Sequence, residues 1–104
     1  MTVFVVPKLD GIHSAVLAAA TQTPESLNMG NWHTCGTTHC RAGWVVHLAG
    51  EAGYALERQT STPFAAMMIY KESSDIHVPP TRFYDSNEQG IADMKRCAEL
   101  EARV

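Results

Sequence analysis

Apolar residues recur at helical spacing in several stretches of the chain, and the first stretch follows Asp10. Asp10 is a favourable N-cap, and the alanine-rich segment after it has a high helix propensity. One stripe of this segment is apolar and contains Ile12, Val16, Ala19 and Ala20. The pattern predicts a helix at about 11–21, ended by the turn at 21–24.

The second stretch, HCRAGWVVHLA, is apolar nearly all round and carries one fixed charge, Arg41. A helix of this kind is normally buried. We expect it to begin with Thr37 or Thr38 as its N-cap and to end at Gly50, a typical C-terminal stop. Gly43 in its middle costs up to about 1 kcal/mol relative to alanine, which predicts a close helix approach on that side.

After the break near Gly50, residues 52–59 are expected to continue as a helical turn. Thr62 and Pro63 then form an N-cap followed by a proline at the first helical position, which predicts a third helix over 63–73. The candidate core and flank residues of this helix are Phe64, Met67, Met68 and Tyr70.

The last helix begins with a capping box, in which Ser86 is the N-cap and Gln89 follows three residues later. Its predicted inward stripe contains Ile91, Met94, Cys97, Ala98 and Glu101. Its predicted outer, charged face contains Asp93, Lys95, Arg96 and Glu99.

The segments between the helices complete the predicted architecture. Residues 2–6, TVFVV, favour a strand or an extended arm that packs on the domain or pairs with another copy. Residues 24–38 are predicted to be an irregular connection, and Pro79-Pro80 predicts a loop without regular structure over 73–85. We therefore expect one domain over 1–104, a mainly α bundle of about four helices (10–104) with an extended N-terminal arm or short strand (1–9).

Composition and charge narrow the classes of function. The net charge is −3, and the eight lysines and arginines are scattered, whereas nucleic-acid binders usually carry a basic stripe. Direct nucleic-acid binding is therefore not expected. No apolar run reaches the roughly 18–20 residues of a membrane span, and the N-terminus does not resemble a signal peptide. We expect a cytoplasmic protein that does not bind membranes and whose three cysteines are reduced.

Residues 32–44, WHTCGTTHCRAGW, contain the strongest candidate chemistry. Zinc prefers cysteine and histidine ligands in tetrahedral sets, and the candidate ligands here are His33, Cys35, His39 and Cys40. His47 lies about two helical turns beyond Cys40, too far for both to bind one metal. No second, well-spaced ligand pair follows, so we expect no metal and no other cofactor, with zinc as the alternative. In the competing interpretation Cys40 is a small buried apolar residue.

Two other chemistries use the same stretch or the carboxylates that follow it. Cys35 and Cys40 flank the predicted start of a helix, where a thiol pKa falls, and could close a reversible disulfide. Their spacing is not the C-x-x-C of thioredoxin-like proteins. The acid–base candidates, Glu51 with Glu57 and Asp75 with His77, have no pattern that places them together. We therefore predict no catalytic residues.

The aromatic residues suggest a different use. The chain contains more large aromatics than a small bundle must expose, and any that stay outside would anchor a protein partner or a second copy. The six that we consider are Trp32, Trp44, Phe64, Tyr70, Phe83 and Tyr84.

Three segments together resemble a small, uncharacterised bacterial and phage module that is often found beside pentapeptide-repeat segments. They are MGNWHTCGTTHCRAGWVVHLAGEAGYALE, PFAAMMIYKESS and RFYDSNEQGIADMKRCAE, and the resemblance extends from about residue 3 to residue 101. The motif of the module, W-x-x-C-x-x-x-x-C-x-A-G-W, is matched by Trp32, Cys35, Cys40, Ala42, Gly43 and Trp44. The resemblance implies no activity or catalytic residue.

The chain has no pentapeptide repeats, so any role that depends on such a neighbour is not implied here. A copy without that neighbour suggests a small accessory protein carried by a phage or prophage. From the sequence we expect a non-enzymatic interaction protein, in one version an inhibitor, that binds a protein partner. The alternative is a zinc or thiol-redox module using Cys35 and Cys40.

Overall fold

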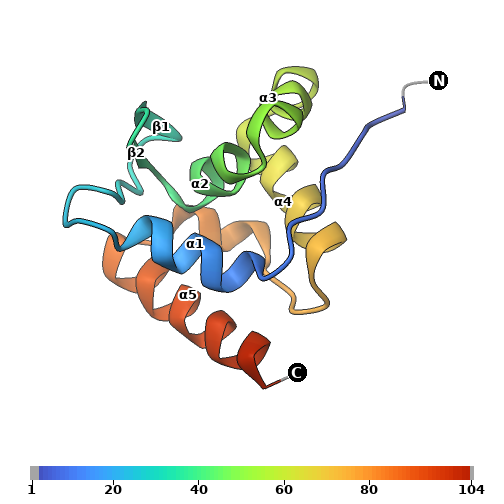
Figure 1. The fold of residues 1–104 in the computed structure, drawn as a ribbon. Helices are drawn as coiled ribbons and strands as arrows, with labels where there is room; N and C mark the ends of the chain where they lie inside the picture. Colours follow the sequence, from blue (N-terminus) through green and yellow to red (C-terminus); the bar gives the residue numbers. More distant parts are fainter. Residues whose placement is uncertain (1–2, 104) are drawn as a thin grey trace.

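The structure, a computed structural model, describes residues 3–103 and is mainly α-helical, as predicted. Five α-helices and one small hairpin form the chain (Figure 1). The helices are α1 (Ile12–Ala20), α2 (Arg41–Leu48), α3 (Gly50–Gln59), α4 (Thr62–Ser73) and α5 (Asn87–Ala102). Five helices replace the expected four because residues 50–59 form a full helix rather than a turn.

Helix α2 is the central element and packs against α1, α3 and α4, while α1 also packs along α5 (Figure 1). The six residues from Arg41 to Val46 are all buried, which confirms the prediction of a buried helix. The apolar core is contributed by all five helices, and its largest fully buried members include Ile12, Val46, Leu56, Ile69 and Met94. Gly50 has φ 66°, a left-handed conformation that favours glycine, and turns the chain from α2 into α3.

The N-terminus of α1 is capped by a residue far away in the sequence. Asp10 was the predicted N-cap, but the cap position is Gly11, which has no side chain to accept a hydrogen bond. The carboxylate of Glu101 instead accepts the backbone N–H groups of His13 and Ser14, at 2.8 and 3.0 Å, and the Ser14 hydroxyl at 2.8 Å. Although partial burial works against the charge, these donors lower the pKa of Glu101.

The predicted irregular connection contains a β-hairpin that the sequence did not indicate. Strand β1 (His33–Cys35) pairs antiparallel with β2 (Thr38–His39), and His39 also bridges to Leu27. Because β2 occupies the residues expected to start the second helix, neither Thr37 nor Thr38 is its N-cap. The cap is Cys40, whose sulfur accepts the backbone N–H of Gly43 at 3.3 Å.

The second half of the chain follows the prediction more closely. Ser61 rather than Thr62 caps α4, which moves Pro63 to the second helical position, still within the first turn where proline is tolerated. Ser86 and Gln89 form the predicted capping box of α5. The loop before it was predicted to lack regular structure, and that prediction is wrong: it contains a short 3-10 helix, η1 (Pro80–Tyr84), whose first-position proline needs no hydrogen-bond donor there.

Residues 3–9 form an extended arm and no strand. Phe4 and Val6 pack against the core, whereas Val3 and Val5 are about three-quarters exposed. Figure 1 shows the arm leaving α1 and running past α4, and the Leu9 N–H donates to Ser73 of α4 at 3.0 Å. The prediction of an arm is therefore confirmed for residues 3–9; the first two positions lie outside the described residues. No helix of residues 3–103 is long and apolar enough to cross a membrane.

Arg41 of α2 is completely buried and ion-paired in the middle of the core. Its Nη1 donates to Asp93 of α5 at 2.7 Å, and its Nε donates to the Tyr70 hydroxyl of α4 at 3.0 Å. Asp93 was expected on the charged outer face of α5, and that prediction is wrong. Burial alone would raise the pKa of Asp93, but hydrogen bonds from Arg41 and Arg96 lower it below its usual value.

We predict that Arg41→Gln destabilises the protein by about 3 kcal/mol or more, because it removes the buried partner that meets the Asp93 carboxylate inside the core. The measurement is the free energy of unfolding from urea titration. The matched control is Arg58→Gln, which breaks a pair with Glu51 that is largely exposed on both sides and should cost less than about 1 kcal/mol. Equal losses in the two variants would contradict the central role of Arg41.

Candidate functional site

Several residues of the motif in 32–44 hold the hairpin against α2. The Trp32 carbonyl accepts the Cys40 N–H at 3.2 Å, and a Cβ atom added to Gly43 would lie 1.9 Å from the same carbonyl oxygen. The close approach predicted at Gly43 is therefore made by the hairpin and not by another helix. The Trp44 indole donates to the Ser26 carbonyl at 2.8 Å. The motif is a packing arrangement that fixes the position of Trp32.

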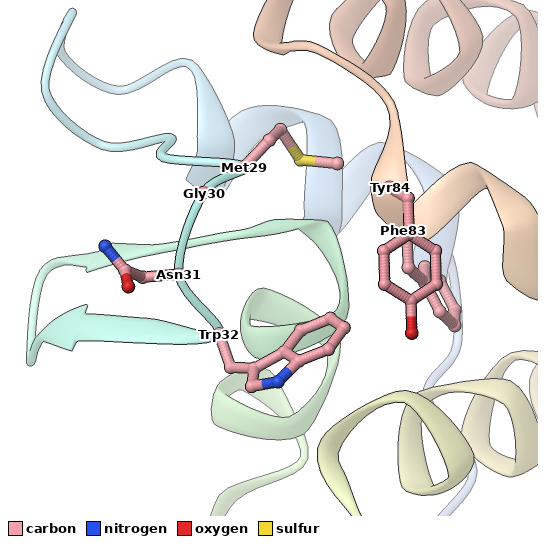
Figure 2. A pocket seen from close by; sticks show the side chains of 6 residues that line it. All are labelled: Met29, Gly30, Asn31, Trp32, Phe83 and Tyr84. Atoms are coloured by element: carbon pink, nitrogen blue, oxygen red, sulfur yellow. The ribbon is translucent and has the colours of Figure 1, made fainter.

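Trp32 and Tyr84 border a pocket of about 280 Å³, which we call the aromatic pocket (Figure 2). The two rings meet edge to face, with centroids 5.7 Å apart. Tyr84 is 71% exposed, more than any other aromatic residue of the described chain, and Trp32 is half-buried. The full lining is Met29, Gly30, Asn31, Trp32, Phe83 and Tyr84; in Figure 2 the Trp32 indole extends toward Tyr84 while the Asn31 side chain points away.

Hydrogen bonds hold the loop that forms one wall of the aromatic pocket. Asn87, the first residue of α5, accepts the Met29 N–H at 2.9 Å and donates to the Leu27 carbonyl at 3.1 Å. The Asn28 side chain accepts the Gly30 N–H at 2.9 Å. The opposite wall belongs to η1, where Phe83 is buried in the core. The pocket is thus formed before any ligand arrives.

A second polar cluster lies between the hairpin and α3, and we call it the histidine cluster. His33 Nδ1 lies 2.7 Å from His39 Nδ1, and His33 Nε2 lies 2.6 Å from a carboxylate oxygen of Glu57. Thr62 of α4 donates to the same Glu57 oxygen at 2.7 Å. His39 is buried, and its Nε2 lies 3.2 Å from the Gly36 carbonyl, while the His47 ring stacks on it at 4.6 Å.

The hydrogen bonds of the histidine cluster indicate the tautomer of His39. Because the Gly36 carbonyl can only accept, His39 Nε2 carries a proton, and a neutral His39 then accepts at Nδ1 from His33 Nδ1–H. His33 Nε2 then faces the Glu57 carboxylate at 2.6 Å. A neutral His39 agrees with its pKa, which burial lowers.

The acid–base groups His33, His39 and Glu57 of the histidine cluster lie outside the best-formed pockets of the described residues. Among the other acid–base candidates, Glu51 forms an exposed pair with Arg58, and Asp75 and His77 are both exposed. The structure thus joins Glu57 to His33 rather than to Glu51.

Cys35 and Cys40 occupy different environments, and both are free thiols. Cys35 is exposed near the tip of the hairpin, where hydrogen bonds from Thr37 lower its pKa to about 7. Cys40 is buried at the base of the hairpin, where burial raises its pKa, and it caps α2. No disulfide joins the two cysteines in the structure, and that they lie close enough to pair or share a ligand stays a prediction.

The candidate zinc ligands do not converge. Of the set His33, Cys35, His39 and Cys40, the structure brings together only the two histidines, and their facing nitrogens bond to each other. In residues 3–103 no three side chains of His, Cys, Asp or Glu are placed to hold a metal ion. The two histidines of the motif therefore use these ring nitrogens for a hydrogen bond within the protein and not for a metal ion.

Sequence reasoning missed the partners that lie far along the chain. His33 and Glu57 are separated by 24 residues and Arg41 and Asp93 by 52, so no local spacing connects them. One signal was present, because a single arginine in an otherwise apolar helix requires a buried acidic partner. Nothing in the pattern indicated which carboxylate it would be.

Comparisons with known proteins identify no relative of this chain. No protein-family model, curated protein or solved structure matches it. The resemblance to the bacterial and phage module therefore stays a prediction, and the site has to be interpreted from its own geometry.

We predict that Gly43→Ala destabilises the protein by at least about 1–3 kcal/mol, because the added Cβ would collide with backbone, which cannot rotate away. The matched control is Gly36→Ala at the hairpin tip, where an added Cβ meets nothing within 4 Å. Urea titration of both variants gives the comparison. A Gly43 variant as stable as the Gly36 variant would show that the hairpin does not rest on α2.

We also predict that stability falls as the pH drops from about 7 to 5. Burial lowers the pKa of His13 and His39, so the unfolded chain binds their protons first. The free energy of unfolding is then fully retained above the ordinary pKa of about 6.5 and decreases below it, by at most about 1.4 kcal/mol per pH unit for each histidine.

His13 is the better position for a test, since neither ring nitrogen has a hydrogen-bond partner among the described residues. His13→Leu should flatten the decrease of the unfolding free energy between pH 7 and 5. His77→Gln, which removes an exposed imidazole, is the control. An unchanged slope in His13→Leu would refute the assignment.

Proposed function

We propose that this chain is a non-enzymatic interaction protein that binds another protein, or a second copy of itself, through the aromatic pocket. The observation that carries the proposal is Tyr84, a tyrosine that is 71% exposed yet braced edge to face by Trp32. A folded protein gains little from leaving such a ring in water. At an interface, by contrast, tyrosine supplies large contact area at a small cost in side-chain entropy.

The surroundings of Tyr84 support this choice over the other exposed aromatic. Phe64 at the start of α4 is 44% exposed but lines none of the best-formed pockets. Tyr84 and Trp32 belong to a pocket whose loop wall is fixed by Asn87, and pre-formed pockets with central aromatic residues are where binding energy concentrates.

The biological setting of the proposal comes from the sequence. The resemblance described above favours a small phage- or prophage-borne accessory protein, in one version an inhibitor of an enzyme, that acts in the cytoplasm. We propose no redox function for a Cys35–Cys40 pair.

The proposal predicts that Tyr84→Ala abolishes capture of a partner. Wild-type protein, Tyr84→Ala and Phe64→Ala are immobilised, exposed to a lysate of the source organism, and the retained proteins are identified by mass spectrometry. A partner should be retained by wild type and Phe64→Ala, and its purified form should bind Tyr84→Ala about tenfold or more weakly, as for a central tyrosine.

Tyr84 is mostly exposed, so its replacement should leave the melting temperature almost unchanged, and this is checked first. If every protein retained by wild type binds Tyr84→Ala equally well, the aromatic pocket is not the binding surface. If wild type retains nothing reproducibly, the interaction function itself is refuted.

A further inference from the structure

A second pocket lies beside the aromatic pocket and is lined by two arginines. We call it the arginine pocket; its volume is about 280 Å³, and its lining is Arg82, Gln89, Ala92, Asp93 and Arg96. The side chains of Arg82 and Arg96 are 41% and 50% exposed, whereas Asp93 at the bottom is 2% exposed. The pocket is therefore open to solvent on the side where the two guanidinium groups lie.

The only carboxylate that lines the arginine pocket is already shared by three guanidinium groups. Arg41 binds one oxygen of Asp93 from inside the core at 2.7 Å. Arg96 and Arg82 approach the other oxygen from outside, at 2.9 and 3.5 Å. Asp85 adds one further acidic contact, to Arg82 at 3.3 Å. Three positive charges thus face two negative ones, and the open side of the pocket keeps a positive charge.

Unused hydrogen-bond donors accompany this charge. Arg96 directs Nε and Nη2 at Asp93 or Cys97, and its Nη1 has no acceptor among the described residues. Arg82 likewise leaves Nε without an acceptor in the part of the chain that the structure describes. Each arginine is oriented by Asp93, so its remaining donors are held in place for an anionic group.

The two pockets lie on either side of the same short helix. A 3-10 helix has three residues per turn, and in η1 Phe83 points into the core, so its neighbours Arg82 and Tyr84 project to its two sides. Their backbone positions differ by a rise of roughly 4 Å. One extended segment of a partner could therefore reach both pockets.

We propose that the partner contributes an acidic segment, in which a large apolar side chain enters the aromatic pocket and a neighbouring carboxylate enters the arginine pocket. This inference rests on the proposed function and specifies the chemistry of the partner. The chain as a whole carries a net charge of −3, which by itself does not favour an acidic partner. A local positive pocket beside the aromatic anchor then fixes where and in which orientation the segment binds.

The test uses two fluorescein-labelled peptides that differ only in the residues on both sides of a central tryptophan, glutamate in one and glutamine in the other. Fluorescence anisotropy at low salt gives their affinities for wild type, Arg82→Gln, Arg96→Gln, Tyr84→Ala and Lys95→Gln. Lys95 is exposed, lies on α5 outside the pocket, and is the control for loss of one positive charge.

The glutamate peptide should bind wild type about five- to tenfold more tightly than the glutamine peptide, as charge-assisted hydrogen bonds to arginine predict. That preference should disappear in Arg82→Gln and Arg96→Gln, remain in Lys95→Gln, and weaken with added salt. Tyr84→Ala should weaken both peptides. Melting temperatures identify any variant that fails to fold. If Arg82→Gln fails, Arg82→Lys replaces it, because lysine keeps the positive charge but lacks the paired N–H donors of the guanidinium group.

Equal affinity of the two peptides, with both lost in Tyr84→Ala, would overturn the acidic-partner inference and leave the proposed function standing. A preference for glutamate that Lys95→Gln reduces as much as Arg96→Gln would also overturn it, because only net charge would then matter. If neither peptide binds, the acidic partner is refuted, whereas the proposed function is decided by the capture experiment with Tyr84→Ala.

Discussion

The buried ion pair between Arg41 and Asp93 is the contact on which the rest of the structure depends. Removing a guanidinium group from water is costly, and the cost is offset only where partners meet it with good geometry. Here α4 supplies the Tyr70 hydroxyl and α5 supplies Asp93. An apolar core of similar volume could pack in several arrangements, but these donors and acceptors match in one. The pair thereby sets how α2, α4 and α5 sit relative to each other, and through Asp93 it also orients the exposed Arg82 and Arg96.

Four of the five helices could be predicted because each has a local signal, such as the capping box of α5 or the apolar circumference of α2, whereas α3 was expected only as a helical turn. The hairpin could not, because strands of three and two residues are too short for an alternating pattern and stand in a segment containing glycine and polar residues. Asp93 was misplaced for a related reason. Its neighbours Lys95 and Arg96 are exposed. A prediction from helical periodicity places every charged residue on the exposed face unless a buried partner is known.

The candidate site could likewise be predicted from the sequence only in part. Sequence spacing singled out the motif in 32–44, and the structure gives every member except the exposed Cys35 a packing role that spacing alone could not distinguish from metal binding. Cys40 caps a helix, Gly43 makes room for a carbonyl, and Trp32 borders a pocket. Tyr84 was one of six aromatic candidates, and only the three-dimensional structure separates it from the buried ones, because exposure is a property of the whole fold.

The cap on α1 has a consequence for how the chain folds. The first helix of the protein cannot satisfy its own N-terminal amide groups, and the carboxylate that does so is 88 residues further along. Without residue 101 in place, these amide groups can be satisfied only by water. A helix of nine residues is marginal by itself in water. The order of α1 therefore depends on the packing of the last turn of α5, so a change that loosens that turn should also loosen the start of α1.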